Sequence, residues 1–109
     1  MHWDVEYTDE QESINASVML LGSLGPQLPY PHSSGINGSR HDHMRELRVQ
    51  HQGRPYRLLY AFDPRRTAIL LIGGDKTGDK RRYAKAVPVA DRLYDEHVQT
   101  LRMEGLIDG

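Results

Sequence analysis

The feature that most constrains the fold is a series of three strand-like segments joined by short turns. The segments are residues 44–51, 56–62 and 67–72, and the turns contain Gln52-Gly53-Arg54-Pro55 and Asp63-Pro64-Arg65-Arg66. Connections this short join antiparallel neighbours, because parallel strands need a crossover of about a dozen residues or more. Segment 56–62 is apolar on both faces except at Arg57, which predicts a central strand. We therefore expect an antiparallel meander.

The segments on either side of the meander predict one strand and two helices. Residues 2–7 alternate as in a half-buried strand, and a helical pattern then runs to Gly25-Pro26. Residues 26–43 are rich in Pro, Ser, Gly and His and predict a long loop. The C-terminal helix has apolar residues at three- or four-residue steps, namely Tyr83, Val87, Ala90, Tyr94, Val98 and Leu101. Pro88 lies inside that pattern and predicts a kink or a restart.

These elements predict an α+β fold, with helices packed on one face of a small antiparallel sheet made of the meander and the N-terminal strand. The 109 residues fit a single domain, 1–109. The chain has no cysteine, which excludes disulfides, thiolate metal sites and a cysteine nucleophile. The N-terminus does not resemble a secretory signal, and the longest apolar run, residues 68–72, is too short to span a bilayer. We expect a cytoplasmic protein without a membrane partner or a cofactor.

Charge is distributed unevenly along the chain. Residues 40–82 contain 11 basic and 5 acidic side chains, a net charge of +6, so the remainder carries −7 within a total of −1. A local excess of positive charge suits the binding of a polyanion on one face. Basic residues that simply surround an ordinary sheet would produce the same count.

An ordered series of motifs resembles the RelE/ParE toxin superfamily, and within it the HigB-like, phage-derived branch. The series contains Glu46-Leu47-Arg48, residues 56–63, residues 71–76, Tyr83, Ala90, Tyr94 and His97. The resemblance extends from Gly25-Pro26 to about Leu101. It implies a RelE-like fold, the activity of a ribosome-dependent mRNA endonuclease in a type II toxin–antitoxin system, and a helix-turn-helix antitoxin as partner.

The N-terminal region departs from this branch, whose members usually have two helices between the first strand and the Gly-Pro pair. Only about 16 residues separate Tyr7 from Ser23-Leu24, so one helix is expected to be missing. The shortened region is expected to expose apolar surface near Trp3, Tyr7 and Leu20. Self-association, or a hetero-oligomer with the antitoxin, would cover that surface.

Two arginines are the first candidates for catalysis. Metal-independent RNA cleavage needs a base for the 2′-hydroxyl, positive charge for the phosphorane and an acid for the leaving oxygen. Arg57 is charged in an otherwise apolar strand, and the resemblance implies a phosphate-binding arginine there. A structural ion pair with Glu46 is the alternative. Arg48 either binds phosphate or pairs with Glu46.

The resemblance adds Lys76 and Tyr83 to the catalytic set. Lys76 follows Gly73-Gly74 and is otherwise an ordinary loop lysine, whereas Tyr83 is otherwise a core aromatic. The basic side chains expected to contact RNA are Arg45, Arg54, Lys80, Arg81 and Arg82.

Histidines supply candidates for proton transfer. His43 and His51 flank the second strand and, with Glu46, are the acid or base candidates. His41 and His43 lack a third ligand at zinc-like spacing, so we assign no metal. His97 is expected to be a partly buried structural side chain.

Two other functions fit the same fold. One is a catalytically defective protein that binds its antitoxin or RNA without cutting. The other is a ParE-like inhibitor of gyrase, since the superfamily divides in that way.

Overall fold

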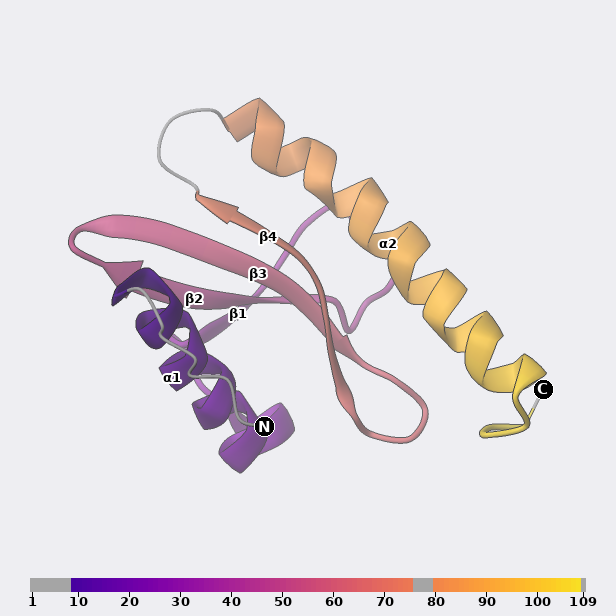
Figure 1. The fold of residues 1–109 in the computed structure, drawn as a ribbon. Coiled ribbons are helices and arrows are strands. Elements are labelled where there is room, and N and C mark those ends of the chain that lie inside the picture. Colours follow the sequence, from indigo (N-terminus) through magenta and orange to yellow (C-terminus); the bar gives the residue numbers. More distant parts are fainter. Residues whose placement is uncertain (1–8, 76–79, 109) are drawn as a thin grey trace, which may run out of the picture.

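The computed structural model describes residues 9–75 and 80–108 of the chain (Figure 1). Its elements in order are α1 (Asp9–Leu24), the 3-10 helix η1 (Gly25–Gln27), β1 (Ser33–Gly35), β2 (Arg45–His51), β3 (Arg54–Phe62), β4 (Ala68–Asp75) and α2 (Lys80–Met103). The predicted α+β class with a small antiparallel sheet is confirmed. The strand predicted at residues 2–7 lies outside the described residues.

The sheet has four strands in the order β1-β2-β3-β4, and all neighbours are antiparallel. The predicted meander is confirmed as β2, β3 and β4, with β3 inside the sheet. The predicted loop over residues 26–43 is wrong in one part, because residues 33–35 form β1 on the edge of β2. The sequence Ser33-Ser34-Gly35 has no strand pattern of its own, so its strand conformation comes from pairing with that edge.

Residues with positive φ lie where the chain reverses, at the end of α1 and in the turn between β2 and β3. Helix α1 ends at Leu24, and Gly25 follows with a φ of 57°, the left-handed conformation that commonly ends helices. Gln52 and Gly53 both have positive φ and connect His51 to Arg54 in a two-residue hairpin turn. Such turns match the twist of antiparallel strands, so β2 and β3 lie in register from this turn onward.

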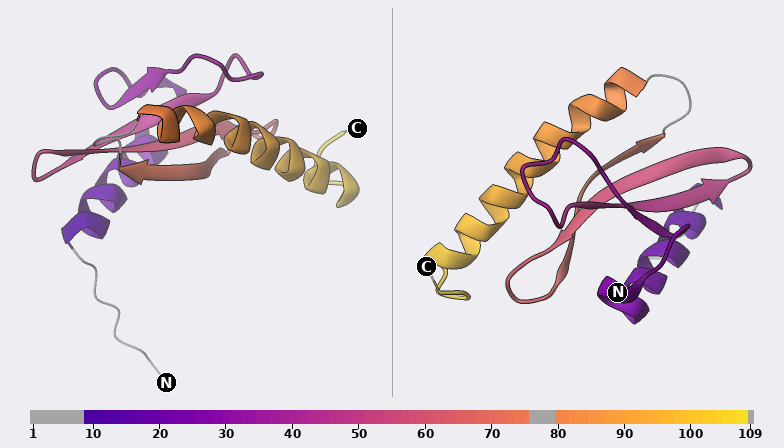
Figure 2. Two further views of the ribbon diagram at one scale, coloured as in Figure 1. Left: turned by 90° about the horizontal axis from the view of Figure 1, so that it is seen from above. Right: turned by 180° about the vertical axis from the view of Figure 1, so that it is seen from behind.

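The two helices pack on opposite faces of the sheet, which corrects the prediction that both lie on one face (Figure 2). Leu59 and Ala61 of β3 cluster with residues of α2, whereas Tyr60 clusters with Leu21 of α1. Side chains alternate between faces along a strand, so these two clusters lie on different sides. The physical reason is that β3 is apolar on both faces, and each apolar face needs its own cover.

Helix α2 continues through Pro88 from Lys80 to Met103. Of the two alternatives predicted at Pro88, the restart is therefore wrong, and the kink stays a prediction. Proline lacks an amide hydrogen, so the carbonyl of Ala84 loses its usual helical partner. Both residues are exposed, and water can reach that position. The apolar stripe that packs on the sheet continues on both sides of the proline, with Val87, Ala90, Tyr94 and Val98 in one cluster.

Gly73 gives a first test of this packing. It lies in β4 opposite Leu58, and a Cβ there would overlap the Leu58 side chain and come within 3.3 Å of the Arg57 carbonyl oxygen. We expect Gly73→Ala to lower the free energy of unfolding by about 1–3 kcal/mol, as overpacking usually does. Urea denaturation measures this. Gly22→Ala is the control, because open space surrounds Gly22 in α1. A Gly73→Ala protein as stable as the wild type would contradict the packing.

Candidate functional site

Three charged side chains from β2 and β3 meet on the face of the sheet that α2 covers. Arg48 lies directly opposite Arg57 in the ladder, and Glu46 precedes Arg48 by two residues on the same face. Glu46 Oε1 lies 3.7 Å from Arg48 Nη1 and 3.6 Å from Arg57 Nε. The hydroxyl of Ser34 in β1 donates to the same oxygen at 3.0 Å. We call Glu46, Arg48 and Arg57 the arginine cluster. Both ion pairs considered from the sequence are present.

The two arginines differ in exposure. The side chains of Arg57 and Glu46 are each 6% exposed, whereas that of Arg48 is 27% exposed. Arg57 Nη1 also donates to the carbonyl oxygen of Tyr56 at 2.9 Å, which orients its guanidinium. Among themselves the three side chains carry two positive charges and one negative charge, and interactions between charges are stronger where water is excluded. Arg48 is therefore the cation that reaches the surface, and Arg57 adds charge beneath it.

A groove of about 410 Å³ runs beside Glu46. It lies between the segment around β1 and the first half of α2, and its other lining residues are Gly35, Ile36, Asn37, Gly38, Ala84, Val87 and Pro88. Several of these side chains are small or absent, so a ligand in the groove would approach the backbone. The groove gives an extended ligand room next to the arginine cluster.

The remaining catalytic candidates follow the end of β4. Gly74 lies opposite Arg57 in the β3–β4 ladder, so the chain leaves the sheet beside the arginine cluster. Lys76 lies outside the described residues. Tyr83, together with Lys80, Arg81 and Arg82, belongs to the start of α2, but these four side chains lie outside what the structure describes. Their assigned roles stay predictions.

Three other candidates are not brought to the arginine cluster. Arg45 and His51 alternate with Glu46 and Arg48 along β2, so they face α1 instead. Arg45 Nε donates to Ser33 Oγ at 2.9 Å, and His51 Nδ1 lies 2.9 Å from the Ser13 hydroxyl of α1. Arg54 is exposed at the β2–β3 turn. A ligand bound to the arginine cluster would therefore be separated from Arg45 and His51 by the sheet.

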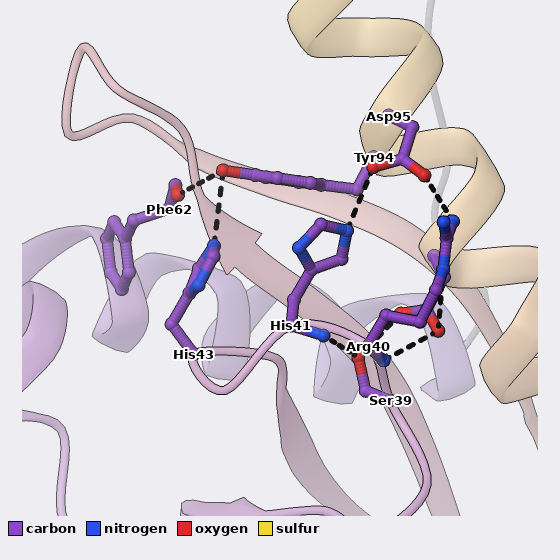
Figure 3. A network of polar contacts seen from close by, with 8 residues as sticks. Ser39, Arg40, His41, His43, Phe62, Tyr94 and Asp95 are labelled. Atoms are coloured by element: carbon purple, nitrogen blue, oxygen red, sulfur yellow. Dashed lines mark hydrogen bonds and ion pairs between the residues drawn. The ribbon is translucent and has the colours of Figure 1, made fainter.

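His43 belongs to a second group, centred on Tyr94 of α2 (Figure 3). His43 Nε2 lies 3.2 Å from the Tyr94 hydroxyl, which donates to the carbonyl oxygen of Phe62 at 3.0 Å. His41 packs edge-on against the same ring, with centroids 4.8 Å apart, and its Nε2 lies 2.9 Å from Asp95 Oδ1. We call this group the Tyr94 network. It accounts for His43 as a side chain that attaches the preceding loop to α2.

Ser39 and Arg40 extend the attachment of this loop to α2. The Ser39 hydroxyl and the Arg40 amide donate to the buried carboxylate of Asp91 at 2.5 and 3.0 Å, and Arg40 also pairs with Asp95. Burial raises the pKa of Asp95, but hydrogen bonds from His41 and Arg40 outweigh this and lower it. Tyr94, Asp91 and Asp95 were not predicted from the sequence as partners of the loop. Their contacts join positions about 50 residues apart, for which a single sequence carries no signal.

Asp63 is a buried carboxylate at the turn between β3 and β4. Its oxygens accept hydrogen bonds from the side chain and amide of Arg65 and the amide of Thr67, and Oδ2 lies 2.9 Å from His97 Nε2. Burial alone raises the pKa of Asp63, but these hydrogen bonds outweigh it and bring the pKa down from 3.8 to about 2. The structural role predicted for His97 is confirmed. Burial, and then the charges of Asp63 and Asp95, raise the pKa of Tyr94.

Within residues 9–75 and 80–108, no three His, Cys, Asp or Glu side chains gather as metal ligands. In that same part of the chain, none of the helices combines the length and the apolar character that spanning a bilayer requires.

Comparison with known proteins connects this geometry to a family. Residues 7–95 match the family described as "Phage derived protein Gp49-like (DUF891)". A protein named "Putative toxin HigB3" from Mycobacterium tuberculosis (strain ATCC 25618 / H37Rv) is 44% identical over 85 residues, which cover 77% of this chain and 73% of that protein. "Putative toxin HigB2" from the same strain is 40% identical over 89 residues, or 80% of this chain and 44% of the relative. No solved structure matches the chain.

The family match includes the arginine cluster and the Tyr94 network in full, because both lie within residues 7–95. It also covers most of the chain. The resemblance to HigB-like toxins predicted from the motifs is confirmed, and the chain belongs to the phage-derived, Gp49-like family.

Proposed function

We propose that this protein is the toxin of a type II toxin–antitoxin system and acts as a ribosome-dependent mRNA endonuclease. The observation that carries the proposal is the placement of Arg48 against Arg57 around Glu46, at the edge of an open groove. Two guanidinium groups at one site suit a phosphate whose charge grows during cleavage. The identity of 40–44% to the proteins named "Putative toxin HigB3" and "Putative toxin HigB2" supports the toxin part of the proposal.

The geometry suggests a division of roles in the reaction. Arg48 binds the scissile phosphate from the surface, and the buried charge of Arg57 stabilises the phosphorane from below. Of the three acid or base candidates, Glu46 is the one in contact with both arginines. We therefore assign Glu46 to accept the proton of the 2′-hydroxyl. Tyr83 and Lys76 are proposed to protonate the leaving oxygen and to add positive charge, and neither role needs a metal.

The proposal includes three partners. A helix-turn-helix antitoxin would neutralise the protein, as the toxin family implies. The ribosome would present the mRNA, so the reaction would take place in the cytoplasm. Assembly as a homo-oligomer, or as a hetero-oligomer with the antitoxin, is part of the same proposal and is measurable by sedimentation.

Primer extension on an mRNA translated in a purified ribosome system tests the proposed function. We expect new cuts within codons when the protein is added, and no cuts when ribosomes are omitted. Folded protein that produces no cuts with ribosomes would contradict the proposal and favour a toxin fold that only binds. Growth arrest accompanied by DNA-damage signals, again without RNA cuts, would favour a gyrase inhibitor.

Arg48 gives the sharpest test of the exposed cation. We expect Arg48→Ala to slow cutting about 100-fold or more, the usual cost of removing one donor to the transition state. Arg48→Lys should cut at a rate between those of the wild type and Arg48→Ala, because lysine keeps the charge and loses the planar fork. Stability should change by less than ~1 kcal/mol, since the side chain is partly exposed. Arg92→Ala, at an exposed arginine of α2, is the control. Equal rates for Arg48→Ala and Arg92→Ala would contradict the role.

A further inference from the structure

Tyr30 is an exposed aromatic residue beside the arginine cluster. It is 70% exposed, and the guanidinium carbon of Arg48 lies over its ring, 5.1 Å from the centroid. A ring in this position leaves apolar surface in water, which forgoes the stability gained from burial. The contact with Arg48 occupies one face of the ring. The exposure of the residue leaves the opposite face open to solvent.

The backbone holds Tyr30 in place relative to Arg48. The amides of His32 and Ser33 donate to the carbonyl oxygen of Pro29 at 2.9 and 3.1 Å, which closes a turn around Tyr30. The carbonyl oxygen of His32 accepts from the Arg48 amide at 2.8 Å. Leu28 and Ser33 are buried on either side of the turn. The ring is therefore presented by a hydrogen-bonded turn fastened to β2, the strand that carries Arg48.

A chain of contacts connects the ring to the groove. The groove is lined by Glu46, which contacts Arg48, and Arg48 in turn contacts Tyr30. A single-stranded RNA that extends from the groove toward Tyr30 would meet Arg48 at the surface, with Arg57 buried beneath it, and then the aromatic ring. Aromatic side chains stack on unpaired bases, and arginine binds the adjoining phosphate through its fork.

We propose that Tyr30 is a nucleobase-stacking subsite, in which a base next to the scissile phosphate stacks on the open face of the ring. The inference rests on the proposed function and names a substrate contact for it. Stacking on an aromatic ring needs no particular base, so the subsite would add affinity and alignment more than sequence preference. Tyr30 acts here through direct contact with the RNA, while its other face supports Arg48.

The test compares rates of ribosome-dependent cutting by primer extension at subsaturating protein. We expect Tyr30→Ala to slow cutting roughly 5- to 150-fold, which corresponds to the loss of one stacked base. Tyr30→Leu should be impaired in the same way, because leucine covers Arg48 without offering a planar face. Tyr30→Phe should retain most of the wild-type cutting rate, since phenylalanine keeps the aromatic ring. Met103→Ala, at an exposed apolar residue at the end of α2, should leave the rate unchanged.

The outcomes separate the subsite from the proposed function. If wild-type protein does not cut, the endonuclease proposal fails. If wild-type and Tyr30→Leu cut at the same rate, the stacking subsite is wrong and the endonuclease stands. Full cutting by Tyr30→Ala, with weaker copurification of a coexpressed antitoxin, would reassign the ring to protein binding and also overturn the subsite. Circular dichroism melting checks that the variants are folded, which the exposure of Tyr30 leads us to expect.

Discussion

Arg57→Ala is expected to abolish detectable RNA cutting and the growth arrest that it causes. Removing one charged donor at a transition state typically costs about 100- to 1,000-fold, and burial of Arg57 places its effect at the upper end. The same change leaves the buried Glu46 with less compensating charge. Removing one partner of a buried pair costs about 3–5 kcal/mol, and the remaining contacts of Glu46 with Arg48 and Ser34 favour the lower end of that range.

A second variant separates lost chemistry from lost stability. Arg57→Met combined with Glu46→Gln removes both buried charges and roughly conserves volume, so it is expected to be close to wild type in urea denaturation. It should nevertheless be inactive in primer extension. Wild-type cutting by this double variant would show that the pair is only structural. Growth arrest that survives in Arg57→Ala together with DNA-damage signals would instead support the gyrase inhibitor.

Asp63→Asn is expected to lower the free energy of unfolding by about 2–3 kcal/mol at pH 7. The pKa of Asp63 is lowered from 3.8 to about 2 in the folded protein, because hydrogen bonds to the charged form outweigh the effect of burial. Each pKa unit corresponds to about 1.4 kcal/mol, so the shift itself accounts for that size of effect. A carboxyl whose pKa is lower in the folded than in the unfolded protein stabilises the fold at a pH above the unfolded-state pKa. That contribution is lost as the pH falls and the carboxylate of the folded protein is protonated.

The pH dependence checks the sign of this effect. Urea denaturation between pH 7 and pH 2 should show the contribution of Asp63 in full above about pH 4. It should then be lost progressively as the pH falls toward 2. Asp63→Asn should lose this part of the acid dependence, and Asp42→Asn, at an exposed aspartate, should keep it. Parallel acid profiles for wild-type and Asp63→Asn proteins would contradict the assignment.

Local sequence patterns were sufficient to predict most of the fold. The alternation in β2, the apolar run in β3 and the short turns identified the meander, and the spacing from Val87 to Leu101 identified α2. These patterns work because side chains repeat every two residues in a strand and about every 3.6 in a helix. The same reasoning missed β1, whose strand conformation depends on the edge of β2.

For the site, the sequence singled out Arg57 as the charged residue of an apolar strand. The Glu46-Leu47-Arg48 motif, with Glu46 and Arg48 on one face of the neighbouring strand, supplied the other two candidates. The sequence also identified both Glu46–arginine pairs as alternatives, and both are present. It did not separate His43 and His51 from the arginine cluster, since residues close in the chain can face opposite sides of a sheet or different helices. It assigned no role to Tyr30, whose contact with Arg48 joins residues 18 positions apart.

The helices, the meander, the central position of β3 and the charged candidates follow from the order of residues. They depend on local periodicity and on the cost of burying charge. Other features were decided only by the tertiary structure. They are the face of the sheet that each helix covers, the short strand β1, and the partners of Asp63, Tyr94 and Arg48. They arise when segments distant in the chain come together, and a single sequence does not encode such pairings in any local pattern. The arginine cluster belongs to both groups, since its members are visible in the sequence and their 3.6 and 3.7 Å contacts exist only once β2 and β3 pair.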